Sequence, residues 1–134
     1  EMQEAVDALS WQFVAALTKG LTKDTPKDTG FASINWIPTI GAKFQGTAGY
    51  RADAVHAGIL KRDVQRAHLS LLRKYKSSMG RLYLTNNTSY IAKLNNGSSA
   101  QAPRAFIQKR VEITKFQFNG RDFSLKVTRV GGLV

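Results

Sequence analysis

The triplet Asp28-Thr29-Gly30 is the part of this chain that most suggests catalysis, because aspartic proteases use Asp-Thr-Gly as their catalytic motif. Such enzymes bring two aspartates together so that they share one proton. A chain of 134 residues would have to do this as a homodimer. The triplet here follows Thr25-Pro26-Lys27, where retroviral-type proteases have bulky apolar residues of a buried strand. The sequence therefore favours a turn in which Asp28 accepts backbone N–H bonds and Gly30 supplies an unusual backbone angle.

The other residue types that carry catalysis or bind metals are sparse. The chain has no cysteine, which excludes thiolate catalysis, disulfides and cysteine-ligated zinc. Its two histidines, His56 and His68, lack metal-ligating spacing and have no carboxylate cluster around them. No nucleophile elbow, phosphate-binding loop or dinucleotide fingerprint is present. The sequence thus predicts a protein that is not an enzyme and has neither a metal nor a cofactor.

The net charge of +11 is the strongest compositional feature. Residues 1–28 hold five acids and three lysines, so the rest of the chain carries a net +13. Such a field attracts polyanions, either nucleic acid or an acidic protein surface, although it can also serve solubility alone. If DNA is the partner, we expect phosphate contacts without sequence reading. Seven cations lie within residues 61–81, namely Lys61, Arg62, Arg66, Arg73, Lys74, Lys76 and Arg81.

The length and the apolar content predict one domain that covers residues 1–134. Apolar residues make up 43% of the chain, which is enough for a packed core. No apolar run approaches the roughly 18 residues that span a bilayer, so a membrane is not an expected partner.

In the first half of the chain, hydrophobic spacing predicts a helix, a strand and a loop. Residues 2–21 read as a helix, and residues 30–41 read as a strand that Pro38 places at a sheet edge or interrupts. Residues 42–53 read as a flexible loop. The apolar stripe of the helix consists of Val6, Leu9, Phe13, Val14, Leu17 and Leu21.

The middle of the chain predicts a long basic helix over residues 52–78, ended by Gly80 as a left-handed cap. Residues 81–85 then read as a strand. The apolar stripe of this helix consists of Leu60, Val64, Ala67, Leu71, Tyr75 and Met79.

The last third predicts two further helices and a C-terminal arm. Residues 86–89 offer N-cap oxygens to a short helix over 90–94, and Pro103 fits the first position of the next helix, with Phe106, Ile107 and Val111 as its buried side. Residues 115–134 read as a strand or hairpin arm, unless the preceding helix continues through Phe116. The predicted fold class is α+β, with an N-terminal helix, a long central basic helix and a helix of the C-terminal half on a small, mostly antiparallel sheet.

Two groups of turn residues, taken in order, resemble a known family. The first group consists of Thr25, Pro26, Asp28, Thr29, Gly30, Asn35 and Trp36. The second consists of Asn86, Tyr90, Gly97, Ser98, Ser99, Ala102 and Pro103. Over about residues 5–113, they resemble the tail-completion or neck (head–tail connector) proteins of long-tailed double-stranded DNA bacteriophages. The chain departs from that family at Asn95-Asn96, where many members carry an acidic–aromatic pair.

The resemblance implies a structural protein of the virion. Such proteins form a ring, here expected to be a hexamer, that completes the tail and joins it to the head connector around the DNA path. The implied partners are other copies of the chain, neighbouring neck, connector, tail-terminator or tail-tube proteins, and genomic double-stranded DNA in the lumen. The implied location is the virion tail or neck, with the host cytoplasm during assembly. The alternative is a sequence-independent, basic DNA-binding module.

Overall fold

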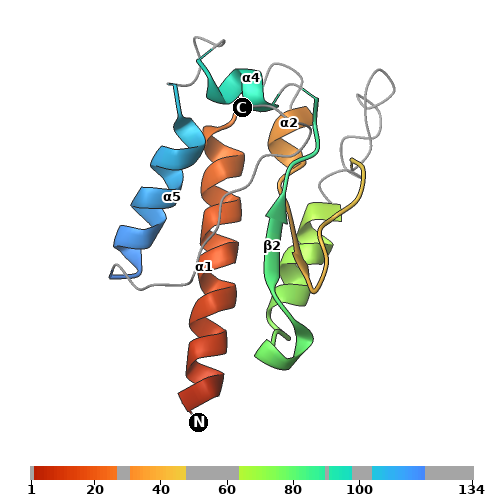
Figure 1. Ribbon diagram of the computed structural model, residues 1–134, viewed down its shortest axis with the longest axis vertical. Helices are drawn as coiled ribbons and strands as arrows, with labels where there is room; N and C mark the ends of the chain where they lie inside the picture. The colour runs from red at the N-terminus through yellow and green to blue at the C-terminus, as the bar shows by residue number, and fades with distance from the viewer. Residues whose placement is uncertain (1, 27–30, 48–63, 90, 98–103, 120–134) are drawn as a thin grey trace.

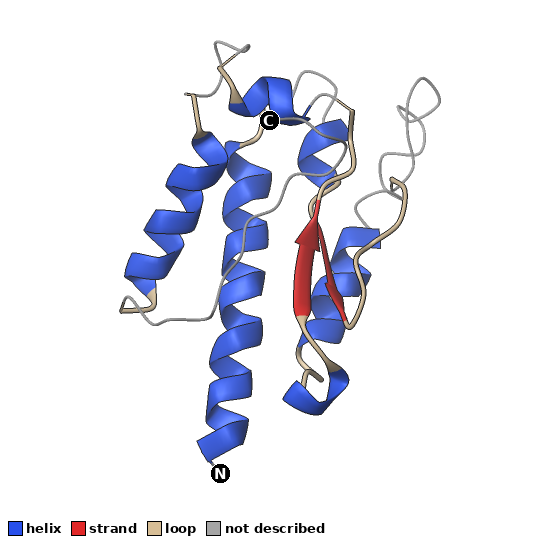
Figure 2. Cartoon of the chain, in the orientation of Figure 1, coloured by secondary structure: helices blue, strands red, loops and turns tan. Residues whose placement is uncertain are grey.

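The computed structural model describes residues 2–26, 31–47, 64–89, 91–97 and 104–119 (Figure 1). It confirms the α+β fold class, because helices pack around a two-stranded antiparallel sheet (Figure 2). The long helix α1, Met2–Asp24, lies between α5, Phe106–Gln117, and the sheet. A helix over residues 64–72 lies beside the sheet.

The first helix confirms most of the predicted apolar stripe. Phe13, Leu17 and Leu21 are between 1% and 5% exposed and lie in the core. Val6 was wrongly assigned to the buried stripe, because it is 46% exposed. The neighbouring Asp7 is 7% exposed and accepts the backbone N–H of Ser77 at 3.1 Å, so the buried side of this turn carries Asp7 and not Val6.

The strand predicted over residues 30–41 is shorter than expected. A single turn of helix, α2 (Phe31–Ile34), replaces its first part. The backbone N–H of Asn35 closes this turn by donating to the carbonyl of Ala32 at 3.2 Å. The strand β1 covers only Ile37–Ile40. Pro38 lies within it, and β1 has a single neighbour in the described sheet, which agrees with the predicted edge position.

The second strand, β2 (Leu82–Thr85), confirms its prediction and pairs with β1 in antiparallel register, Ile37 opposite Thr85. At the far end of the pair, Gly41 donates its N–H to the carbonyl of Arg81 at 2.7 Å. A Cβ on Gly80 would lie 3.3 Å from the Cα of Gly41, so glycine permits this close approach of two backbones. Gly80 has φ 104° and ψ −155°, which is not the predicted left-handed helical cap.

The central helix departs most from the prediction. Its described part ends at residue 72, and a separate 3-10 turn, η1 (Ser77–Met79), follows. Residues 52–63 lie outside the described part of the chain. The predicted stripe is also displaced by one position, because Leu72 is fully buried whereas Leu71 is 49% exposed and Met79 is 47% exposed. Gln65, seven residues before Leu72, is buried on the same face of the helix.

The last third contains α4, Ile91–Asn95, and α5. Helix α5 begins three residues after Pro103, which itself lies outside the described residues. Phe106 and Val111 are buried, as predicted, whereas Ile107 is only partly buried and Thr114 is buried in addition. The helix continues through Phe116 to Gln117, so the helix extension is confirmed over this stretch, and residues 120–134 of the predicted arm lie outside the description.

The core lies where α1 meets α5 and the start of β1. It consists of Phe13, Leu17, Leu21, Trp36, Phe106 and Val111. The ring of Phe118 packs edge-on against that of Phe13, with centroids 5.5 Å apart, and so closes the core after α5. None of the helices described here is both long enough and apolar enough to cross a membrane.

The rotation of the central helix gives a direct test. We expect Leu72→Ala to lower the free energy of unfolding by about 2–5 kcal/mol, because it leaves a cavity in packed surroundings. The matched change Leu71→Ala should cost less than about 0.5 kcal/mol, since that side chain is half exposed. Urea denaturation followed by circular dichroism measures both. A larger loss for Leu71→Ala would contradict the observed helix orientation.

Candidate functional site

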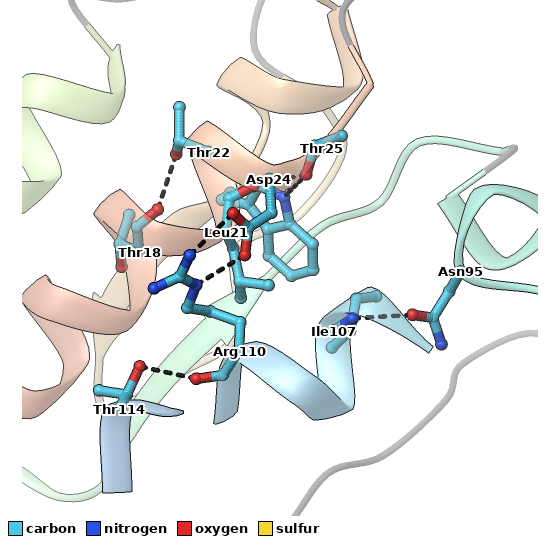
Figure 3. Close-up of polar contacts among 10 residues, drawn as sticks. Thr18, Leu21, Thr22, Asp24, Thr25, Asn95, Ile107, Arg110 and Thr114 are labelled. Carbon is cyan, nitrogen blue, oxygen red and sulfur yellow. Dashed lines mark hydrogen bonds and ion pairs between the residues drawn. The ribbon is translucent and has the colours of Figure 1, made fainter. Parts of the chain in front are cut away.

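Two residues of the first turn motif, Thr25 and Trp36, form a buried clasp at the end of α1. The indole N–H of Trp36 donates to the Thr25 hydroxyl at 2.8 Å, and this hydroxyl donates to the carbonyl of Leu21 at 2.6 Å (Figure 3). Thr25 and Asn35 are each 1% exposed, and Trp36 is 6% exposed. The clasp returns the chain to α1 after the turn, so these residues shape the fold and are not presented to a substrate.

Gln65 extends this clasp to the central helix. Its amide nitrogen donates to the Thr22 hydroxyl at 2.9 Å and to the carbonyl of Trp36 at 3.0 Å. The two bonds hold the helix at the rotation that buries Leu72. The sequence analysis missed Gln65, because a glutamine on a polar helix face has no local feature that distinguishes it from an exposed one.

The second motif joins the first through Asn86. Its side-chain amide donates to the carbonyl of Ala32 at 2.9 Å, and its Oδ1 accepts from the backbone N–H and the hydroxyl of Thr88. Asn86 thus organises the turn that precedes α4, but its described bonds go to Thr88 and not to an N–H group of α4, so they do not make the predicted N-cap. Asn87 instead donates to the carbonyls of Phe44 and Gly46 at 2.9 and 2.8 Å, which ties down the described part of the predicted flexible loop.

Asn95 caps α5 from a neighbouring element. The position before this helix is Ala105, with φ 62° and no side chain able to cap. The Oδ1 of Asn95 accepts the backbone N–H of Ile107 at 2.9 Å (Figure 3). Its side-chain amide donates to the Oε1 of Gln108 at 2.9 Å. Asn95 thus satisfies one of the N–H groups that a helix start leaves without a partner. Asn95 and Asn96 stand at the positions where many members of the phage family that the sequence resembles carry an acidic–aromatic pair.

An ion pair that the sequence analysis did not predict joins α5 to α1. Two nitrogens of Arg110 donate to the two oxygens of Asp24 at 2.6 and 2.8 Å (Figure 3). The hydrogen bond to Asp24 raises the pKa of Arg110, against the opposing effect of burial. A Cβ on Gly20 would lie 2.5 Å from the Arg110 side chain, so this glycine makes room for the arginine to cross α1.

Two further motif residues, Pro26 and Gly97, lie within the described part of the chain. Pro26 is buried after α1, and Gly97 has φ 91° in the turn after α4, consistent with the predicted turn. The residues Asp28, Thr29, Gly30, Tyr90, Ser98, Ser99, Ala102 and Pro103 lie outside the described part of the chain.

The predicted contact cations do not share one helix face. Arg66 lies on the central helix, whereas Arg73 and Lys74 occupy the turn after it, Lys76 precedes η1 and Arg81 precedes β2. All five are exposed, and no carboxylate among the described residues pairs with any of them. Lys61 and Arg62 lie outside the description. The exposed cations therefore remain available to a partner.

A groove of about 500 Å³ lies between the segment 42–45 and the central helix. Its lining includes Ile40 and Phe44 on one side, and Leu71 and Met79 on the other. The rings of Phe44 and His68 meet edge-to-face across it, with centroids 5.4 Å apart. Burial lowers the pKa of His68 below its ordinary value of 6.5.

The clasp predicts a measurable coupling between Thr25 and Trp36. We expect Thr25→Val to lower the free energy of unfolding by about 1–3 kcal/mol, because it leaves the buried indole N–H without an acceptor. In a double-mutant cycle with Trp36→Phe, the two losses should not add. Urea denaturation of the single and double variants measures this coupling.

Thr18→Val is the matched control for this cycle. Thr18 is fully buried in the same helix, and its hydroxyl donates only to the carbonyl of Val14 one turn earlier. Its effect should add to that of Trp36→Phe within about 0.5 kcal/mol. Equal coupling for the two threonines would show that the Thr25–Trp36 bond has no specific role.

His68 predicts a pH dependence of stability. Because its folded pKa lies below 6.5, the unfolded chain binds the proton more readily. The stability that the neutral His68 contributes is fully present above pH 6.5. It is lost as the pH falls through the lower pKa of His68 in the folded protein. We expect His68→Gln to flatten the unfolding free energy in this window, as measured by urea denaturation across pH. An unchanged profile in the variant would contradict the desolvation of His68.

The described residues include no group of three or more metal-ligating side chains. The described contacts of the motif residues are structural, and the described surface carries exposed cations and an apolar groove. Comparison of the chain with protein-family models, curated proteins and solved structures finds no match.

Proposed function

We propose that this chain is a non-enzymatic subunit of the neck or tail top of a long-tailed bacteriophage, where it forms a ring that completes the tail and joins it to the head connector. The observation that carries the proposal is the meeting of the two motif stretches. Asn86, from the second stretch, donates to the carbonyl of Ala32. Ala32 lies in the chain between Thr25 and Trp36 of the first stretch, whose side chains are bonded to each other. Among the described motif residues, Thr25, Trp36 and Asn86 therefore belong to one connected framework.

The surface charge supports a role inside an assembly. Each chain carries a formal +11, so six copies would carry +66. Self-repulsion on that scale requires an acidic partner, counterions or DNA close by. The five exposed cations of residues 66–81 form no ion pair with a described carboxylate and can meet such a partner.

The projecting end of α1 offers a surface to a neighbouring copy. Met2 is 84% exposed and Val6 is 46% exposed in the first turns of α1, and the N-terminal end of this helix extends beyond the other elements (Figure 1). In a closed ring, each subunit presents one surface to the next copy and a different surface to the previous one. We propose that this end of α1 contributes to one of these surfaces, and that neck, connector, tail-terminator or tail-tube proteins contact the ring from above and below.

The second candidate function is sequence-independent binding of double-stranded DNA. The exposure of Arg66, Arg73, Lys74, Lys76 and Arg81 favours it. Cations alone give an affinity that is blind to sequence and falls steeply with salt. The ring proposal accommodates DNA in the lumen, whereas the rival assigns the whole function to the isolated subunit.

Assembly is the direct test of the ring. We expect the purified chain to form closed rings in negative-stain images, alone or with purified tail tube, with the corresponding mass by light scattering. Deleting residues 119–134 should abolish the rings, because we propose that this arm contacts the next subunit. The truncated monomer should stay folded, since it keeps Phe118 against Phe13.

Normal assembly by the truncated chain would contradict the role of the arm. A full-length chain that stays monomeric even beside the tail tube would contradict the ring itself. As a discriminating control, fluorescence anisotropy with two unrelated duplexes between about 50 and 200 mM salt measures binding by the monomer. Steep, sequence-blind affinity without any assembly would favour the DNA-binding alternative.

A further inference from the structure

The groove between the segment 42–45 and the central helix has walls held in place by other parts of the fold. On one side, Asn87 donates to the carbonyls of Phe44 and Gly46, and the Thr39 hydroxyl donates to the carbonyl of Ala42. On the other side, the buried Leu72 and the bonds of Gln65 fix the helix. A site that exists before binding loses less entropy when it is occupied. The groove is therefore suited to binding.

The lining of the groove is mainly apolar. Leu71 and Met79 line the groove and are 49% and 47% exposed. Both side chains can therefore bury more apolar surface when a partner binds. Together with Ile40 and Phe44, they form a contiguous apolar surface. Such surfaces on soluble domains mark sites of protein or ligand contact. A methionine at this site also lets the surface adapt to the shape of its partner.

The rim of the groove is positively charged. Lys43 and Lys74 line it. The four acids of the described residues, Glu4, Asp7, Asp24 and Glu112, do not line it. A complementary partner therefore presents carboxylates around apolar side chains.

We propose that this groove binds a partner protein through a short segment whose apolar side chains are flanked by aspartate or glutamate. The apolar lining favours a protein over a nucleic acid, because phosphate contacts need cations and gain nothing from exposed Leu71 and Met79. The inference deepens the proposed neck function, on which it rests for the biological setting of the partner. Peptide binding and ring formation are measured separately, so either can fail without the other.

The test selects ligands with the full-length chain. A displayed library of random peptides is selected on the wild-type protein and counter-selected on the variant Leu71→Ser/Met79→Ser. Both side chains are about half exposed, so this variant should remain folded, which circular dichroism checks. We expect the selected peptides to combine leucine, isoleucine or phenylalanine with aspartate or glutamate. Fluorescein-labelled copies should bind the variant at least about tenfold more weakly, equivalent to about 1.4 kcal/mol.

Matched variants separate the apolar contribution from the charged one. Lys43→Ala/Lys74→Ala should weaken binding and reduce its salt dependence, whereas Lys109→Ala, an exposed lysine on α5, should leave both unchanged. Met2→Ser/Val6→Ser removes exposed apolar side chains away from the groove and should also have no effect.

Four results would overturn the proposal. The first is the absence of any peptide whose affinity depends on Leu71 and Met79, and the second is selection of peptides without acids. The third is a random-sequence DNA duplex that displaces the peptides and needs the lysines but not the apolar pair, which would make the surface a DNA contact. The fourth is self-association that Leu71→Ser/Met79→Ser abolishes, which would assign the groove to a second copy of the chain.

Discussion

Three polar side chains, two in the last turn of α1 and one directly after it, each hold a different part of the molecule. Thr22 accepts from Gln65 of the central helix, Asp24 pairs with Arg110 of α5, and Thr25 accepts from Trp36 at the start of β1. The rest of the structure depends on this turn, because elements 11 to 86 residues away in the chain converge on it. Apolar packing pulls these elements together, but it is not directional. The hydrogen bonds fix how each element is oriented.

The consequences extend to the surface. The bonds of Gln65 set the rotation of the central helix, which buries Leu72 and leaves Leu71 at the groove. In the same way, Asn87 fixes the opposite wall by holding the carbonyls of Phe44 and Gly46. The described residues of the turn motifs therefore do not contact a partner themselves. They position the exposed apolar and basic groups that can do so.

This division suits a protein whose role is assembly. The buried polar groups described here all have hydrogen-bond partners, so the framework has little reason to rearrange. The charge excess lies outside that framework, on exposed cations that no described acid neutralises. A rigid interior with a strongly basic exterior suits a subunit whose positive charge is neutralised by its neighbours in an assembly. The proposed neck function and the proposed groove partner both follow from this arrangement.

The sequence by itself determined the α+β class, α1, β2, the buried side of α5 and the strong positive charge, because apolar periodicity and composition are local properties. Only the tertiary structure decided that residues 31–34 turn as a helix, that Leu72 and not Leu71 is buried, and that Asn95 caps α5. Adjacent residues of a helix point about 100° apart, so a neighbouring element selects between two overlapping faces. Likewise, the partners Asp24 and Arg110 are 86 residues apart, and no local pattern relates them. The physical reason is that orientation is set by contacts between distant segments, which exist only once the chain has folded.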